Sequence, residues 1–173
     1  ALAAGWLEDD AADACLVLGA EEADWATAEA LRLFSRGHIL AEGAGAVYLR
    51  REPVPGGLAL ERVTDPWTYF DRASQSAALR EVRAEVAAQP GDLLCDGTTG
   101  AGRVESPEEA AWRDWPGVRL APKRVLGEGL MAGAAWQCVS ALDALRQNRY
   151  PAAVVSVPGC NHAAVAARFL RVT

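Results

Sequence analysis

The chain has 173 residues, a length typical of one domain with a buried core. Hydrophobic residues make up 51% of it and charged residues 23%, which argues against disorder because there is ample apolar surface to bury. The formal net charge of −6, with no run of basic residues, argues against nucleic acid as a partner, since phosphate binding needs clustered positive charge.

The first part of the chain alternates between helical and strand patterns. Small residues precede its last apolar run, which indicates close backbone packing there. Residues 52–57 contain two prolines and two glycines, so we place an internal boundary at this segment. In chain order, we expect a helix at 1–10, a strand at 15–18, a helix at 26–34 and an apolar run at 46–49.

The second part continues the alternation, which predicts a layered α/β protein. Its loop at 97–102 lacks the Gly-Lys-Ser/Thr ending and the glycine spacing of phosphate-binding loops, so we do not expect a nucleotide site. In chain order, we expect a strand at 58–63, a helix at 74–88, a strand at 92–95, a helix at 107–114, a strand at 118–121, a glycine-rich loop at 127–133, a helix at 134–147, and strands at 152–157 and 163–170.

No apolar run approaches the ~18 residues that span a bilayer, and the first residues lack the basic flank of a signal peptide. We therefore expect a cytoplasmic protein without a membrane partner. His38 and His162 have no carboxylate or nucleophile nearby in the sequence that would form a catalytic dyad. The cysteines are widely spaced, without a C-x-x-C pair, so we expect buried thiols and neither zinc nor disulfides. They are Cys15, Cys95, Cys138 and Cys160.

Four segments match, in order, the landmarks of one enzyme family. Residues 1–22 end in Leu-Val-Leu-Gly-Ala-Glu-Glu, and residues 37–45 read Gly-His-Ile-Leu-Ala-Glu-Gly-Ala-Gly. These two segments resemble the helix and strand that follow the nucleophilic cysteine of β-ketoacyl synthases, and the Gly-Phe-x-x-x-Glu-Gly-Ala-Gly strand entry of that family. The second match is the most specific of the four.

The third and fourth landmarks depart from the family pattern in the same way. Residues 96–100, Asp-Gly-Thr-Thr-Gly, are followed by Glu-Ser-Pro-Glu-Glu at 105–109 and resemble the family's His-Gly-Thr-Gly-Thr loop, with Asp96 in the place of the histidine. Residues 123–128 have the spacing of the family's Lys-x-x-x-Gly-His, with Glu128 in the place of the histidine. The supporting pocket that the resemblance implies comprises Gly97, Thr98, Lys123, Gly127, Gly159 and Asn161.

These departures indicate a ketosynthase-like subunit that does not itself catalyse the condensation reaction. An active synthase acylates a cysteine, and two neutral imidazoles then donate hydrogen bonds to an enolate, which a carboxylate would repel. None of the four cysteines has the context of the nucleophile, so we expect no catalytic residue, and the resemblance implies no cofactor or metal. Cys95-Asp96-Gly97 and Ala121-Pro122-Lys123 are similar to the corresponding segments of chain length factors, the non-condensing partners of ketosynthases.

The resemblance implies a thiolase-like αβαβα fold, with residues 1–51 ending its first half, 52–57 forming a linker and 58–173 forming its second half. The expected function is that of a chain-length-factor-like subunit that pairs with an active ketosynthase, and works with acyl carrier protein, in polyketide, aryl-polyene or fatty-acid-type elongation. The alternatives are the C-terminal part of an active 3-oxoacyl-(acyl-carrier-protein) synthase and a scaffolding protein that binds acyl carrier protein.

Two structural expectations follow from the resemblance. Another polypeptide, carrying the N-terminal half of the same fold or a ketosynthase subunit, should complete the sheet beside the strand at 15–18. Asp96 and Glu128 should approach one another, with Lys123 close enough to neutralise one of them. Simpler roles stay open for both carboxylates: Asp96 as the cap of a turn and Glu128 as an exposed loop residue.

Overall fold

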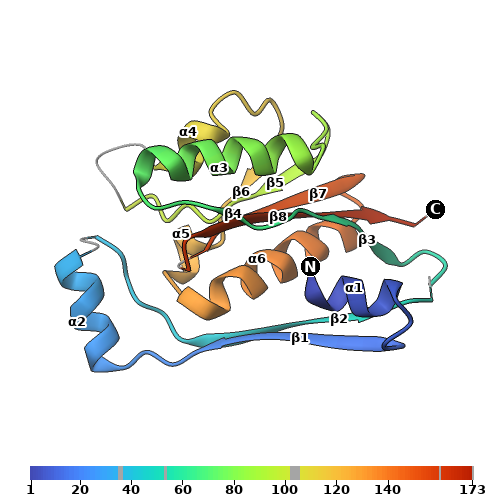
Figure 1. Cartoon of the computed structure of the whole chain (residues 1–173), viewed down its shortest axis with the longest axis horizontal. Coiled ribbons are helices and arrows are strands. Elements are labelled where there is room, and N and C mark those ends of the chain that lie inside the picture. The colour runs from blue at the N-terminus through green and yellow to red at the C-terminus, as the bar shows by residue number, and fades with distance from the viewer. Residues whose placement is uncertain (35–36, 53, 102–105, 160, 173) are drawn as a thin grey trace.

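The chain forms two separate β-sheets with one long helix between them (Figure 1). The structure, a computed structural model, describes residues 1–34, 37–52, 54–101, 106–159 and 161–172. One sheet has two strands and comes from the first 50 residues, and the other has six strands and comes from the rest of the chain. This mixed α/β architecture confirms the predicted fold class.

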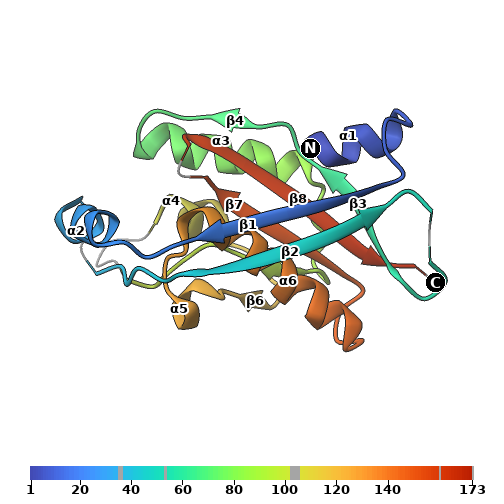
Figure 2. The ribbon, with the colours of Figure 1, turned by 90° about the horizontal axis from the view of Figure 1, so that it is seen from below.

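The first part consists of α1 (Leu2–Glu8), β1 (Ala14–Glu21), α2 (Trp25–Phe34) and β2 (Gly43–Arg50). β1 and β2 pair antiparallel along their full lengths. Helix α2 begins after Asp24, whose carboxylate accepts a hydrogen bond from the backbone N–H of Thr27 at 2.8 Å, as N-cap residues do. In two views α2 lies at one end of the two-stranded sheet, apart from the other helices (Figures 1 and 2).

The second part begins with two strands, β3 and β4, that both pair with its last strand, β8. Its elements are β3 (Leu58–Val63), β4 (Trp67–Thr68), α3 (Arg72–Glu85), β5 (Leu93–Cys95), α4 (Pro107–Ala111), β6 (Arg119–Leu120), α5 (Lys123–Leu126), α6 (Leu130–Arg146), β7 (Ala152–Pro158) and β8 (Ala163–Arg171). The strand order is β3-β8-β7-β5-β6, with β4 also paired to β8. β5 runs parallel to β6 and β7, whereas β8 is antiparallel to β7 and β3.

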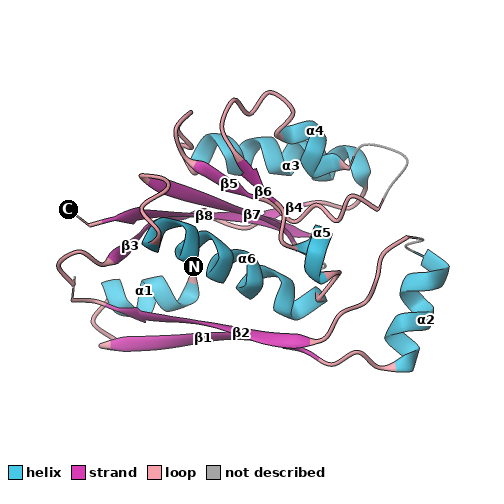
Figure 3. Ribbon diagram, turned by 180° about the vertical axis from the view of Figure 1, so that it is seen from behind, coloured by secondary structure: helices cyan, strands magenta, loops and turns pink. Residues whose placement is uncertain are grey.

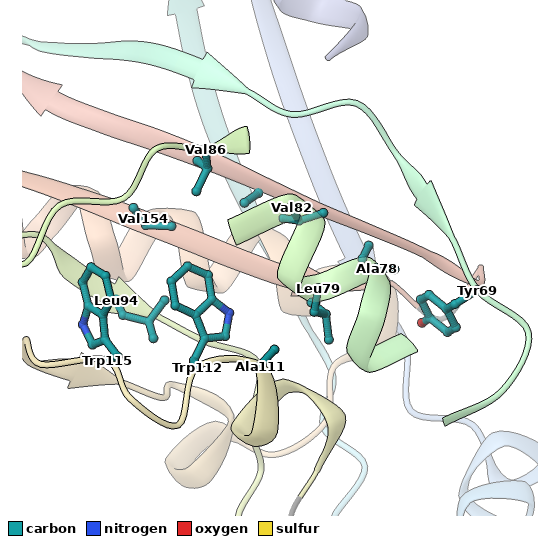
Figure 4. Packing of buried hydrophobic residues seen from close by; sticks show 12 residues of the cluster. Tyr69, Ala78, Leu79, Val82, Val86, Leu94, Ala111, Trp112, Trp115 and Val154 are labelled. Carbon is teal, nitrogen blue, oxygen red and sulfur yellow. The ribbon is translucent and has the colours of Figure 1, made fainter. Parts of the chain in front are cut away.

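The layers follow from which faces of the large sheet are apolar. Helices α3 and α4 cover one face, and α6 covers the other and separates it from the β1–β2 sheet (Figure 3). Under α3 and α4, Leu79, Val82 and Trp112 pack against the sheet residues Leu94 and Val154, and all five are fully buried (Figure 4). Burying each such side chain contributes roughly 1.5–3 kcal/mol, so this interface holds the outer helices in place.

Most predicted elements are confirmed to within a few residues, but α6 begins at Leu130, inside the predicted glycine-rich loop at 127–133. The Glu128 carboxylate accepts a hydrogen bond from the Leu130 backbone N–H, which caps the helix and extends it toward the loop. Two short elements, β4 and α5, were not predicted because two and four residues are too few for a periodic pattern.

The thiols and the helices bear on two expectations from composition. Cys15, Cys95 and Cys138 are free, and Cys95 is fully buried, whereas Cys160 lies outside the described residues. Over the part of the chain that the structure describes, no helix combines the length and apolar character needed to cross a membrane.

Candidate functional site

A pocket of about 230 Å³ brings residues of α5 and α6 together with the end of β7. Three of the predicted site residues line it, Lys123, Glu128 and Gly159, whereas Asp96 does not. A larger, open hollow of about 580 Å³ beside α2 contains none of the predicted site residues. The smaller pocket is therefore the candidate site, and its polar lining includes His38, Tyr69, Gln75, Lys123 and Glu128.

The Lys123–Glu128 ion pair is the main charged feature of this pocket. The ammonium Nζ lies 2.7 Å from Oε1 and 3.0 Å from Oε2 of Glu128, and the two side chains are only 11% and 14% exposed. The Leu130 backbone N–H donates to the same carboxylate at 3.0 Å. This geometry confirms that Lys123 neutralises one of the two carboxylates and excludes the exposed-loop role for Glu128.

The backbone around Glu128 is fixed by contacts with the chain before β2. The Glu128 N–H donates to the Ile39 carbonyl at 2.7 Å, and the Ala41 N–H donates to the Glu128 carbonyl at 3.0 Å. Gly127 has φ of 93°. It lies so close to the segment before β2 that a Cβ there would be 2.7 Å from the Ile39 oxygen. Glycine at this position therefore allows the turn that points Glu128 into the pocket.

Asp96 lies outside this pocket and is 1% exposed at the end of β5. Its Oδ2 accepts a hydrogen bond from Arg119 Nε at 3.0 Å and forms an ion pair with Nη2 at 2.9 Å. Its Oδ1 accepts from the Thr98 N–H at 3.0 Å and the Thr98 hydroxyl at 2.6 Å, which caps the turn after the strand. The turn-cap role is thus present, together with an ion pair between the buried Asp96 and the partly exposed Arg119, which was not predicted.

Arg119 is brought to Asp96 by the order of the strands in the large sheet. β6 pairs parallel to β5, with Leu94 opposite Arg119 and Cys95 opposite Leu120. A cation on the strand beside Asp96 is the expected partner of a carboxylate that is removed from water. Sequence analysis predicted the two strands but not that they were neighbours, so the pair could not be recognised.

Glu108 forms a second buried polar group, and its role was not predicted although it belongs to the third landmark. It is 3% exposed. Its Oε1 accepts from the Ser156 hydroxyl at 2.6 Å and its Oε2 from the Gly97 N–H at 3.0 Å. The Ser156 oxygen in turn accepts from Trp112 Nε1 at 3.1 Å. Burial, reinforced by the charge of Asp96, raises the pKa of Glu108 to about 8.

The expected approach of Asp96 and Glu128 is only indirect. Lys123 binds Glu128, and Asp96 has its own cation, Arg119, so no cation among the described residues bridges the two carboxylates. Both groups nevertheless act on Glu108: the charge of Asp96 raises its pKa, and the charge of Lys123 lowers it. Asp96 and Glu128 therefore belong to two separate ion pairs, and the expected direct approach of the two carboxylates is not observed.

The far wall of the pocket comes from the turn after β7. The Tyr69 hydroxyl donates to the Gly159 carbonyl, and the rings of Tyr69 and His162 are 5.6 Å apart. His162 therefore contacts Tyr69 in this turn. Asn161 is exposed and does not line the pocket. Residues 102–105 of the third landmark, including Glu105, and Cys160 of this turn lie outside the described residues.

One further feature concerns the side chains that could bind a metal ion. Within the described ranges, no three His, Cys, Asp or Glu side chains gather in a way that could hold a metal ion. Of the titratable side chains that line the pocket, Lys123 and Glu128 are engaged with each other. Cys95 does not line it, and burial raises the pKa of this thiol well above its usual range.

Comparisons with solved structures identify the fold. The chain is similar to the ishigamide ketosynthase/chain length factor, with 12% identity and a TM-score of 0.75 over 98% of this chain and 57% of that chain. It is also similar to a chain in the structure of a type II polyketide synthase acyl-carrier protein in complex with its ketosynthase. The identity is 11% and the TM-score 0.74, over 99% of this chain and 54% of that chain. A ketosynthase in complex with its chain length factor from Xenorhabdus doucetiae matches with 14% identity and a TM-score of 0.70 over 99% and 56%.

These likenesses define the class of structure: the chain has the thiolase-like fold of ketosynthases and chain length factors. It spans little more than half the length of each of these three chains. No protein-family model matches the sequence. No curated protein matches it either.

Proposed function

We propose that this chain is a non-condensing, chain-length-factor-like subunit that pairs with an active ketosynthase and works with its acyl carrier protein in polyketide, aryl-polyene or fatty-acid-type elongation. One observation carries the proposal: the two positions that match catalytic histidines by resemblance hold carboxylates, and each carboxylate forms its own ion pair. Asp96 pairs with Arg119, and Glu128 pairs with Lys123. A carboxylate repels the enolate that condensation generates, whereas a neutral imidazole stabilises it.

The condensation assay tests this proposal directly. Carrier protein loaded with malonate is offered to the purified chain, and release of carbon dioxide and formation of a condensed product are measured. We expect both to stay at the level of a blank. Turnover above the blank that is abolished by Asp96→Asn or Glu128→Gln, but kept in the control Glu61→Gln, would instead favour an active synthase. Glu61 is a suitable control because it lies on β3 and contacts Arg168 on the neighbouring strand β8.

The proposed pairing is supported by the strand pattern of the two sheets. In the large sheet, the antiparallel pair β7–β8 is flanked by β5 on one side and β3 on the other. The pair β1–β2 is also antiparallel and packs on α6, but it has no flanking strand among the described residues. Unpaired strand edges are templates for further strands. We propose that residues 1–51 end the first half of the thiolase-like fold and that the missing strands come from that half.

The outer face of β1–β2 supports the same proposal. Gly19 and Gly45 lie opposite one another on the inner face, where a Cβ on either would come within 3.1 Å of the Ala135 Cβ of α6. Side chains alternate along a strand, so Leu16, Leu18 and their partners point outward. Leu16 and Leu18 are 66% and 65% exposed. An apolar row on this face, with only the inner face covered by a helix, is typical of an interaction surface.

This surface has its own test. We expect the purified chain to bind a hydrophobic dye and to self-associate in sedimentation experiments, because the row on β1 is uncovered. Leu18→Arg should reduce both signals, whereas Leu33→Arg on α2, a similarly exposed leucine outside the sheet, should change them far less. A monodisperse chain that binds no dye would contradict the proposed interface.

A further inference from the structure

Glu128 is placed in the pocket as a ligand would be. Its two oxygens receive three hydrogen bonds: two from the Lys123 ammonium at 2.7 and 3.0 Å, and one from the Leu130 backbone N–H at 3.0 Å. All three residues line the same pocket of about 230 Å³. The carboxylate therefore fills a cluster of donors inside a cavity and is not extended toward solvent.

The donors around this carboxylate form a site that favours an anion. Lys123 is 11% exposed and packs across α6, where a Cβ at Gly133 would lie 2.8 Å from Lys123 Cε. An ammonium removed from water in this way needs a negative partner. Leu130 is the first residue of the 17-residue helix α6, whose N-terminus adds partial positive charge at the same point. The Lys123 ammonium and the first N–H of α6 thus both contact the Glu128 carboxylate, whereas the next N–H, that of Met131, donates to Glu21 at 3.2 Å.

We propose that Glu128 is a built-in ligand: it occupies a carboxylate site formed by Lys123 and the Leu130 N–H, so that the pocket excludes carboxylate-bearing ligands and admits uncharged ones. The tethered carboxylate competes at an effective concentration of about millimolar or more, because the backbone turn at Gly127 holds it in place. For its biological meaning the inference rests on the proposed non-condensing function, since a pocket closed to carboxylates does not take up a malonyl group.

The test removes the built-in ligand and offers the same atoms in solution. Glu128→Ala deletes Cγ, Cδ and both carboxylate oxygens, which are the heavy atoms of acetate. We expect the variant to bind acetate with a dissociation constant of about millimolar, and at least about tenfold more tightly than the unmodified chain does. Acetamide, which has the same shape without the charge, should not bind better to the variant than to the unmodified chain. Binding is followed by NMR with 13C-labelled acetate and acetamide.

Two further variants assign the site. Lys123→Met combined with Glu128→Ala should lose the acetate binding, because the ammonium is gone. Glu61→Ala removes one glutamate of the same charge, which contacts Arg168 outside the pocket, and should bind no more acetate than the unmodified chain. Equal acetate binding by the unmodified chain and Glu128→Ala would overturn the inference, and so would acetate binding that survives the loss of Lys123.

A variant that fails to fold also gives an answer. Glu128 caps α6, so Glu128→Ala is expected to be less stable, and its refolding yield can then be measured against acetate and acetamide concentration. Recovery by acetate alone supports the inference, and no recovery, or equal recovery by both, overturns it. Because these assays need neither malonate nor a partner, they separate this inference from the proposed function, which is tested by the condensation assay and by the dye and sedimentation measurements.

Discussion

Replacing Glu108 by glutamine should make the protein's stability less sensitive to pH. The glutamine amide can accept from the Gly97 N–H with its oxygen and donate to the Ser156 hydroxyl with its nitrogen, so it mimics the protonated acid in the same space. Burial raises the pKa of Glu108 from 4.5 to about 8, so the folded protein keeps this proton at pH values where the unfolded chain has released it.

The sign and size of the effect follow from that shift. A raised carboxyl pKa contributes stability that is fully present below about pH 4.5 and is lost as the pH rises to about 8. One pKa unit corresponds to about 1.4 kcal/mol. Between pH 5 and pH 8, the stability of Glu108→Gln relative to the unmodified protein should therefore rise by an amount on the order of 3 kcal/mol.

Urea unfolding at several pH values, followed by tryptophan fluorescence, measures this difference. Trp112 is a suitable reporter because its indole N–H donates to the same Ser156 hydroxyl. Glu109→Gln, a change at the next residue, controls for the loss of one acidic side chain. A difference between Glu108→Gln and the unmodified protein that stays constant from pH 5 to pH 8 would refute the idea that Glu108 holds a proton in the folded state.

Two further substitutions probe the ion pair and the packing between the layers. Arg119→Met leaves the Asp96 carboxylate buried without a cation, so the free energy of unfolding measured in urea should fall by about 3 kcal/mol. Adding Asp96→Asn should partly reverse this loss. A change within the error of the measurement would show that the ion pair is dispensable. Gly19→Ala would place its Cβ 2.8 Å from the Met131 carbonyl oxygen of α6, so the free energy of unfolding should fall by about 1–3 kcal/mol. The control Gly91→Ala, whose Cβ would have no atom within 4 Å, should lower it by less than about 1 kcal/mol. Equal costs for the two glycines would contradict the close packing of β1 on α6.

Sequence patterns predicted the elements of this fold better than the contacts within its site. Alternating apolar periods located β3 at its observed bounds and β1 and β7 within a few residues, because period-2 and period-3.6 patterns reflect burial. The start of α6 was placed too late because glycines near a helix end normally indicate a loop. Here the Glu128 carboxylate accepts from the Leu130 N–H at the start of the helix, a local contact that depends on how the turn at Gly127 directs the Glu128 side chain.

The site shows the same limit. The resemblance led us to expect Lys123 beside one of the two carboxylates, and the structure pairs it with Glu128, five residues further along the chain. The partners of Asp96 and Glu108 lie 23 and 48 residues away in the sequence, so only the order of strands in the sheet brings them together. Arg119 and Ser156 are ordinary strand residues by pattern, and nothing in their neighbourhood distinguishes them.

Helix α6 contacts both the pocket and the β1–β2 sheet. Its first residue, Leu130, lines the pocket, and Ala135, little more than one turn later, packs against Gly19 and Gly45 of the sheet. Close-packed interiors transmit strain, and Ala135 has no flexible side chain that could absorb a displacement. We therefore expect a substitution that shifts the β1–β2 sheet against Ala135 also to move Leu130, and with it one wall of the pocket.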